Sequence, residues 1–395
     1  LRVAPSSMIH ELMRDLSANS TSIGTMSGFF FFGYAPMQIP VGVLCDRYSP
    51  KILLICAVFL CSFATLVFSY TQSIHVASIT RFCIGVASAF AFVGPLVLAS
   101  HWFEEKHMAT VAGVIQFVGC LGAVFAGGPI AKLVEVFGWR QVMFYSAIIG
   151  IVLAIVFKFF LHDSPNKHVD PKSEHKMPVL KQLKELCCNS KTWWLGIVAF
   201  CCWAPISIFA ELWGASFLST VYQVNTVQAA SAATWIWVGI AISSILSGIW
   251  SSKVQSRRTP ILILNVIGLI SSIGVIFYHP ASWLEIDFLL FLLGVAAGVQ
   301  PITFAIACEQ NPPKNHGAAM GFNNMAVIFG GVIFQPLVGI LLTIFWDHKM
   351  FDNAPVYSVG AYEHAMVLIP LCYILGFVVT YFKITETHCK PYYSN

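Results

Sequence analysis

The chain has 395 residues, of which 57% are hydrophobic and only 10% are charged. Soluble domains carry about 25% charged residues, so this composition excludes an ordinary water-soluble domain and is typical of an integral membrane protein. The formal net charge of +4 does not indicate a nucleic-acid partner, because most of the basic residues fall in segments that flank apolar runs.

Apolar runs of helix length follow one another along the chain. A transmembrane helix needs about 20 mostly apolar residues, whereas a barrel strand would show about 10 alternating ones. We predict twelve helices in all. The first is represented by residues 1–12, which we interpret as the outer half of a helix whose start lies upstream. The other eleven runs cover residues 22–44, 52–69, 76–100, 109–133, 141–161, 193–218, 229–250, 260–277, 287–307, 317–345 and 362–382.

The basic residues predict the orientation of these helices. Of the 22 Lys and Arg, sixteen fall in segments that alternating topology places on one side, and the positive-inside rule makes that side cytoplasmic. Four lie at the opposite ends, and Arg2 and Arg81 lie inside helices. We therefore expect a multi-pass membrane protein with cytoplasmic termini.

A charged segment, residues 42–51, lies between the second and third apolar runs and has an echo 206 positions later. Such a repeat at half the chain length indicates two similar halves. We predict an all-α membrane protein of twelve transmembrane helices in two pseudo-symmetric six-helix bundles. The bundles comprise residues 1–161 and, with a cytoplasmic tail, residues 192–395, joined by a cytoplasmic linker at 162–191. The repeated residues are Gly42, Asp46, Arg47 and Lys51, and then Gly248, Ser252, Lys253 and Arg257.

The spacing Gly42-x-x-x-Asp46-Arg47-x-x-x-Lys51 resembles the loop 2–3 motif of the major facilitator superfamily. Ser49 and Pro50 replace the usual glycine and basic residue of that motif, and Ser252 replaces the acid in the second copy. Further resemblances are an Arg-x-x-x-Gly element in helix 4 (Arg81 and Gly85) and a glycine-rich element in helix 5 (Gly119, Gly122, Gly127, Gly128 and Pro129).

The resemblance implies a secondary carrier that works by alternating access. It makes Gly42, Asp46, Arg47 and Lys51 gating residues, of which the Asp and Arg form a cytoplasmic latch. It also implies a proton-coupling role for Arg81, although a purely structural role is equally compatible with its position.

The run Tyr34-x-x-x-Gln38-x-Pro40-x-Gly42 is similar to the organic anion:cation symporters and to the phagosomal amino-acid transporters of intracellular bacteria. This likeness implies an amino acid, a short peptide or an organic acid as substrate, and a bacterial inner membrane as location.

Three ionisable residues, Arg2, Arg81 and Glu211, stand out because a charge inside a membrane helix costs at least a few kcal/mol unless it faces a cavity or a partner. Arg2 lies about ten residues from the end of the first helix, near the midplane, where its guanidinium could hold a carboxylate or phosphate. Glu211, in the seventh helix, is the most deeply embedded carboxylate, and it could exchange a proton for substrate. A static Arg–Glu pair is the alternative for Arg2 and Glu211.

Neutral polar and aromatic residues complete the predicted site. An amide or hydroxyl inside an apolar helix favours a polar cavity, while each Trp alone is more often a packing residue. The predicted substrate-binding set is Arg2, Tyr34, Gln38, Gln116, Trp203, Trp235, Gln300, Asn323 and Asn324.

Motifs for nucleotide binding, metal binding and nucleophilic catalysis are absent from the sequence, so we expect no cofactor, no metal and no enzymatic activity. The preferred function is proton-coupled uptake of a small polar or anionic metabolite by a monomer in membrane lipid, with protons as the second partner. A proton-driven exporter of drugs or siderophores and a non-transporting receptor of the same fold are the alternatives.

Overall fold

The computed structural model describes the chain except residues 101, 103–104, 163–184, 280–281, 313–314 and 391–395, together with the side chains of residues 39, 42–43, 46–47, 100, 105–113 and 116. The linker predicted at 162–191 therefore lies mostly outside the described residues, and the proposed domain boundaries stay a prediction.

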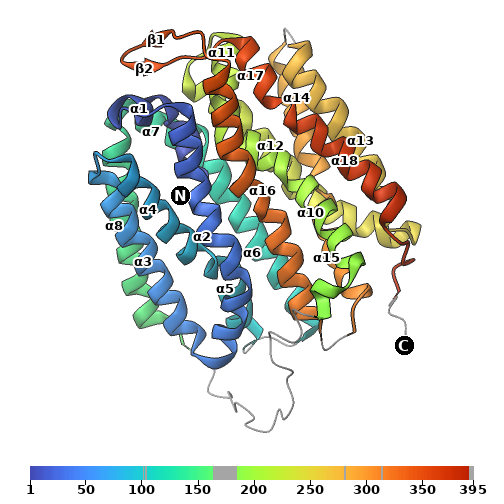
Figure 1. Cartoon of the computed structure of the whole chain (residues 1–395). Coiled ribbons are helices and arrows are strands. Elements are labelled where there is room, and N and C mark those ends of the chain that lie inside the picture. Colours follow the sequence, from blue (N-terminus) through green and yellow to red (C-terminus); the bar gives the residue numbers. More distant parts are fainter. Residues whose placement is uncertain (101, 103–104, 163–184, 280–281, 313–314, 391–395) are drawn as a thin grey trace.

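The described chain is almost entirely helical, as predicted (Figure 1). The N-terminal elements are η1 (Ala4–Ser7), α1 (Ile9–Asp15), α2 (Ser20–Arg47), α3 (Pro50–Tyr70), α4 (Ile74–Ser88), α5 (Phe90–Ser100), α6 (Glu105–Ala126), α7 (Gly128–Phe137) and α8 (Trp139–Phe160). The C-terminal elements are α10 (Ser190–Ile208), η2 (Phe209–Trp213), α11 (Gly214–Tyr222), α12 (Thr226–Val254), α13 (Arg258–Ile273), η3 (Gly274–Tyr278), α14 (Trp283–Ala296), α15 (Val299–Glu309), α16 (His316–Ile344), β1 (Met350–Phe351), β2 (Ala354–Pro355), α17 (Val359–Met366) and α18 (Leu368–Lys383).

Ten helical stretches among the described residues are long and apolar enough to cross a membrane. The helix α2, with 28 residues, is about 42 Å long at 1.5 Å per residue and also exceeds the hydrocarbon thickness. The short elements η1 and α1 occupy the place of the first predicted helix. These helices confirm the prediction of an all-α membrane protein.

Several predicted runs are interrupted where a residue breaks the hydrogen-bond pattern of the helix. The run 109–133 divides into α6 and α7 at Gly127, with Pro129 in the first turn of α7, where a missing N–H is tolerated. The run 193–218 contains the π-helical turn η2 between α10 and α11. Such turns place side chains in positions that a regular helix does not offer.

The charged segment 42–51 is helical over more than half of its length. The helix α2 continues to Arg47, and α3 begins at Pro50, so only Tyr48 and Ser49 connect the two helices. Ser49 caps α3 by accepting a hydrogen bond from the backbone N–H of Ile52, and a proline suits the first helical position.

The second copy of this motif is linked by hydrogen bonds to the C-terminal segment that follows α18. Arg257, which corresponds to Lys51, donates from its guanidinium Nη2 to Glu309 at 2.6 Å, and Glu309 also accepts from the hydroxyl of Thr387, after α18.

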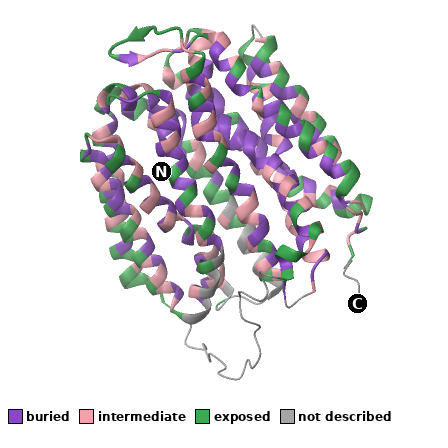
Figure 2. Ribbon diagram, in the orientation of Figure 1, coloured by how far each residue is buried: buried purple, intermediate pink, exposed green. Residues whose placement is uncertain are grey.

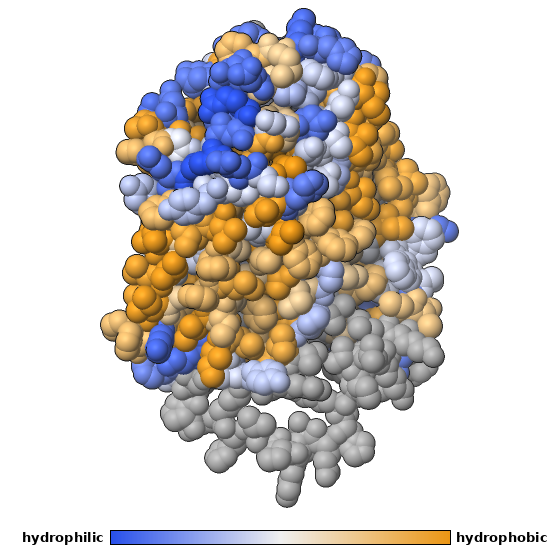
Figure 3. Space-filling model, turned by 60° about the vertical axis from the view of Figure 1, so that its left-hand side comes forward, coloured by the Kyte–Doolittle hydropathy of each residue, from blue (hydrophilic) through white to orange (hydrophobic). Residues whose placement is uncertain are grey.

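Large apolar side chains are exposed on many of the helices. Figure 3 shows hydrophobic residues covering the middle of one face, with hydrophilic residues gathered at the end that carries the β1–β2 hairpin. We call this the hairpin end, and we call the opposite end, where α8 finishes and α10 begins, the linker end. Buried residues concentrate on α10 and the adjoining helices inside the bundle (Figure 2).

The two parts of the chain pack closely at the hairpin end, where α2 meets α16. A Cβ on Gly24 would lie 2.4 Å from the carbonyl oxygen of Gln335, and one on Gly339 would lie 2.3 Å from that of Ser20. The hydroxyl of Ser20 donates to Gly339 O at 2.7 Å. Figure 1 shows α2 and α16 diverging toward the linker end. The hairpin end is therefore closed in this structure.

Candidate functional site

A cavity of about 430 Å³ lies between the N-terminal and C-terminal helices. A second cavity, of about 360 Å³, adjoins it and shares Arg2, Tyr34, Phe92, Cys120 and Trp203. We call the two together the central cavity. The first part is lined by Arg2, Tyr34, Phe92, Phe117, Cys120, Trp203, Ala241, Ser244, Ile245, Gln300, Pro301, Phe304, Asn324, Val327 and Ile328.

The central cavity brings together two of the charged residues singled out in the sequence. A guanidinium nitrogen of Arg2, Nη2, donates to Glu211 Oε1, which also accepts from the indole N–H of Trp203 at 3.2 Å. The side chain of Glu211 is fully buried, whereas that of Arg2 is 27% exposed and faces the cavity. The ion pair therefore has an accessible cationic side and a hidden anionic side.

The π-helical turn η2 explains how Glu211 reaches this position. Pro205, one turn before the end of α10, has no N–H to donate, and the next turns pass into the π-helix Phe209–Trp213. The wider turn rotates Glu211 relative to α10, from which Trp203 projects. The carboxylate and the indole therefore meet although they lie 8 positions apart.

Arg2 is fixed on several sides. Its Cζ lies 5.2 Å from the ring centre of Phe31 and 5.8 Å from that of Trp203, distances at which a guanidinium interacts favourably with an aromatic face. Arg81 donates to the carbonyl oxygens of Leu1 at 2.9 Å and of Arg2 at 3.1 Å. Arg81 thus holds the backbone that carries Arg2, and its own guanidinium lies over Phe30.

Two polar atoms of the pair have no partner. Glu211 Oε2 and Arg2 Nε are buried and make no hydrogen bond within the described structure. A buried polar atom without a partner is costly. Arg2 lines the cavity and can take an acceptor from a ligand, whereas Glu211 is fully buried behind it and can take a proton. The arrangement therefore has unused capacity for an acceptor at Arg2 and for a donor at Glu211.

Of the remaining predicted residues, three are also found here. Tyr34, Gln300 and Asn324 line the cavity. Gln38 lies beneath it and accepts a hydrogen bond from Asn324 Nδ2 at 2.6 Å, which links α2 to α16. Asn323 points elsewhere: it is buried and donates to the hydroxyl of Thr303 at 3.0 Å.

The structure does not bring Trp235 to the cavity. Trp235 is 43% exposed. Trp237 lines the central cavity instead, and its ring centre lies 6.5 Å from that of Trp203. At 100° per residue, positions two apart on α12 face nearly opposite directions. The sequence shows both tryptophans but not the rotation of the helix.

The side chains of Gln116, Gly42, Asp46 and Arg47 lie outside the described residues, so their predicted contacts stay predictions. Lys51 is partly buried at the start of α3. Phe31, Phe92 and Phe304 were missed, because a phenylalanine in an apolar helix carries no signal that separates a cavity wall from lipid.

Comparisons with known proteins bear on the whole chain. A family model described as Major Facilitator Superfamily matches residues 2–334 and 215–388. The chain is similar to GudP of Escherichia coli, described as a probable galactarate/D-glucarate transporter, with 24% identity over 96% of this chain and 89% of that protein. It is also similar to the chloroplastic ascorbate transporter of Arabidopsis thaliana, with 22% identity over 91% of this chain and 70% of the relative.

Solved structures share the fold. A bacterial homologue of the human lysosomal transporter Spinster, in an inward-facing and occupied conformation, superimposes with a TM-score of 0.78 at 15% identity, covering 96% of this chain and 92% of that one. The nucleoside transporter NupG gives a TM-score of 0.76 at 13% identity, covering 97% and 96%.

Proposed function

Because the chain belongs to the Major Facilitator Superfamily, we propose that it carries a small organic acid across the membrane by alternating access, with Arg2 as the anion anchor and Glu211 as the proton carrier. The protein is a multi-pass membrane transporter of a small molecule and not an enzyme. Beyond this, we propose the class of its substrate, the coupling ion and the direction of transport.

The observation that carries this proposal is the ion pair between Arg2 and Glu211 at the wall of the central cavity. A substrate carboxylate can reach Arg2 from the cavity and replace Glu211 as its partner. Glu211 then lies buried without its cation, which is costly for a carboxylate and is relieved by taking up a proton. Each carboxylate bound at Arg2 would thus enter with one proton.

The lining supports an organic acid over an amino acid or a peptide. Among the described lining residues of the larger part of the cavity, Arg2 carries the only formal charge, and it would repel the ammonium group of a zwitterion. Tyr34, Gln300 and Asn324 offer hydroxyl and amide groups to a hydroxylated chain. The volume of about 430 Å³ falls within the range of small-molecule sites. The described substrates of GudP and of the ascorbate transporter are hydroxylated acids, which is consistent with this class.

The test is uptake of D-glucarate into proteoliposomes driven by an imposed pH gradient. With the membrane potential held at zero, a pH gradient equivalent to about 100 mV, acting through one proton per substrate, would support up to about 50-fold accumulation. We expect Arg2→Ala to abolish both binding and uptake. We expect Glu211→Gln to retain exchange of labelled for unlabelled substrate but to lose accumulation driven by the gradient.

The matched control is Glu135→Gln, which removes an exposed carboxylate paired with Lys132 at the surface and should transport normally. Normal accumulation by both Arg2→Ala and Glu211→Gln would refute the assigned roles. Outward pumping of the substrate in inverted vesicles would favour an exporter, and binding without flux would favour a receptor.

The orientation is part of the proposal. The positive-inside rule supports a cytoplasmic linker end with both termini on that side, and the bacterial relatives support the inner membrane of a bacterium. Maleimide labelling of the exposed Cys187 and Cys188, next to the start of α10, from one side of sealed vesicles would test this placement.

A further inference from the structure

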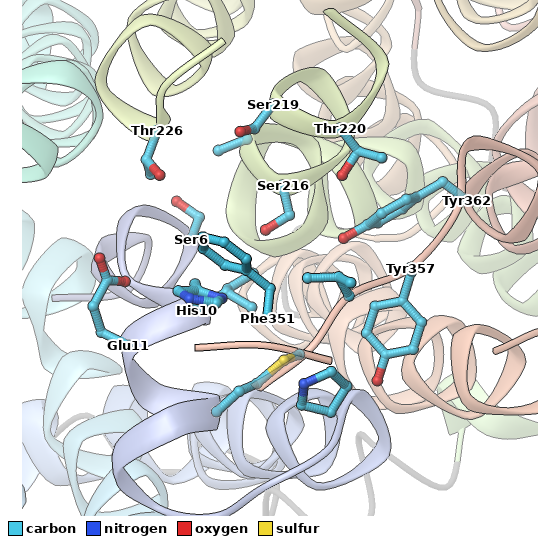
Figure 4. Close-up of a pocket in the computed structure, with 15 residues that line it drawn as sticks. Ser6, His10, Glu11, Ser216, Ser219, Thr220, Thr226, Phe351, Tyr357 and Tyr362 are labelled. Atoms are coloured by element: carbon cyan, nitrogen blue, oxygen red, sulfur yellow. The ribbon is translucent and has the colours of Figure 1, made fainter. Parts of the chain in front are cut away.

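A separate pocket of about 280 Å³ lies at the hairpin end (Figure 4). Three parts of the chain form it: η1 and α1, the segment from α11 to the start of α12, and the segment from the β1–β2 hairpin to α17. It therefore lies between the N-terminal and the C-terminal helices, as the central cavity does.

The pocket is lined by hydroxyl groups. Figure 4 shows Ser6, Ser216, Ser219, Thr220, Thr226 and Tyr362 around the same space. Two of these hydroxyls donate to backbone carbonyls, Ser6 to Val3 at 2.8 Å and Ser219 to Val224 at 2.6 Å. A hydroxyl that has donated its proton keeps its lone pairs, so these two groups can act only as acceptors toward a ligand.

Glu11 adds a stronger acceptor. It lines the pocket beside His10, and its Oε2 is buried without a hydrogen-bond partner in the described structure. None of the lining residues that the structure describes is Lys or Arg, in contrast to the central cavity with Arg2. The pocket therefore suits a ligand that brings hydrogen-bond donors and not one recognised through a carboxylate.

A thin partition separates this pocket from the central cavity. Ser6 in η1 lines the pocket, while Arg2, which precedes η1, lines the central cavity. On the facing helix, Ser216 lies just beyond η2, which holds Glu211. The partition consists of two irregular turns, the 3₁₀ turn η1 and the π-helical turn η2, which contact each other.

We propose that the hairpin-end pocket is a second binding site, which takes small polyhydroxylated solutes through their hydroxyl groups and lies one stage outside the central cavity on the same route. Its place on a transport route rests on the proposed function. Hydroxyl donors satisfy the carboxylate of Glu11, which lines the pocket, and the lone pairs of the serines, without the desolvation cost of a charged ligand. A neutral polyol should therefore bind here, whereas the central cavity should select the acid.

The test uses radiolabelled D-glucitol, a neutral polyol, and the purified full chain in nanodiscs at neutral pH. We expect saturable binding to the unmodified protein. Binding should weaken about tenfold in Glu11→Gln, which keeps the shape but loses the charged acceptor, and about fivefold in Thr226→Val. The thermal unfolding temperature of each variant shows whether it is folded.

Two controls separate the sites. Arg2→Ala should bind D-glucitol as the unmodified protein does, and so should Glu135→Gln, a surface carboxylate outside the pocket. The proposal is overturned if D-glucitol fails to bind, if both pocket variants bind it normally, or if Arg2→Ala loses it. Failure of D-glucarate uptake with D-glucitol binding intact would instead refute the proposed transport function and leave the second site standing.

Discussion

Individual side chains explain why this membrane protein tolerates buried charge. Arg2 and Glu211 lie 209 positions apart in the chain, yet each is the ionic partner of the other. The aromatic rings of Phe31 and Trp203 flank the guanidinium, so replacing Arg2 by Lys would keep a charge but lose the planar contact. Each charge offsets the cost of burying the other. A substrate can reach Arg2 from the cavity and so compete with Glu211 for the guanidinium.

Glu386, beyond α18, shows the same principle outside the membrane. Burial raises the pKa of this carboxyl, but hydrogen bonds from the backbone N–H groups of Arg257 and Arg258 and from the hydroxyl of Ser256 outweigh burial and lower the pKa to about 2. A carboxyl with a depressed pKa contributes stability above its ordinary pKa of 4.5, and loses that contribution as the pH falls toward 2.

We therefore predict that Glu386→Gln lowers the thermal unfolding temperature at pH 7 and reduces the loss of stability as the pH falls from 4.5 to 2. The carboxylate is partly exposed, so solvent screening limits its contribution to about 1 kcal/mol or less. Thermal unfolding in detergent across this range checks it, with Glu135→Gln as the control. An unchanged pH profile in Glu386→Gln would show that other carboxylates account for the acid sensitivity.

At the scale of the elements, irregular turns and glycine contacts position the site. The π-helical turn η2 carries Glu211, and the break between α6 and α7 lets Gly128 approach Ser231 of α12. The hairpin turns at Asp352 and Asn353, both with positive φ, as in a two-residue type I′ turn. These departures from regular helices all occur where the two parts of the chain meet.

We predict that transport requires the close contact between α2 and α16 at Gly24. Gly24→Val would place methyl groups against Gln335 O, where even a Cβ would lie 2.4 Å away, so the closed hairpin end becomes unfavourable. We expect uptake to fall about tenfold or more, with helix content by circular dichroism unchanged. Uptake in proteoliposomes measures the effect.

The control for this prediction is Gly248→Ala on α12, where a Cβ would meet nothing within 4 Å, and which should transport normally. Full activity of Gly24→Val would mean that the transport cycle does not require this close approach of α2 to α16.

At the scale of the whole molecule, a charged clasp joins the two parts of the chain at the hairpin end. Arg14 donates to Asp15 at 2.9 Å and, across the interface, to Asp352 of the hairpin at 2.9 Å. Asp15 also accepts from Trp139 at 3.0 Å and from Arg140. The clasp and the hydroxyl-lined pocket both involve α1 and the hairpin, so both need the same approach of the hairpin to α1.

We predict that Asp352→Asn and Arg14→Gln each shift the population toward an open hairpin end by up to about fivefold, the effect of an exposed ion pair worth at most about 1 kcal/mol. Because each variant removes the same ion pair, Arg14 with Asp352, the double variant should open no further than either single one. Spin-label distances across the hairpin end measure the shift, and 1 M salt should reduce it. Additive opening in the double variant would mean that the two residues act independently.

The amino-acid sequence alone determined the features that depend on composition and on local pattern. A charged or polar side chain in an apolar run is costly whatever the fold, so the sequence alone singles out Arg2, Glu211, Tyr34, Gln300 and Asn324. The helical spans follow in the same way, because a membrane leaves the backbone no other regular solution than a helix or a closed barrel.

The tertiary structure decided what depends on direction and on distance. Three features depend on how each helix is rotated about its axis. They are the pairing of Arg2 with Glu211, the choice of Trp237 over Trp235, and the placement of Glu11 and hairpin residues around one pocket. Irregular turns such as η2 set that rotation, and it is fixed only when distant segments pack against each other. Local sequence records the cost of a polar side chain but not the partner that offsets it.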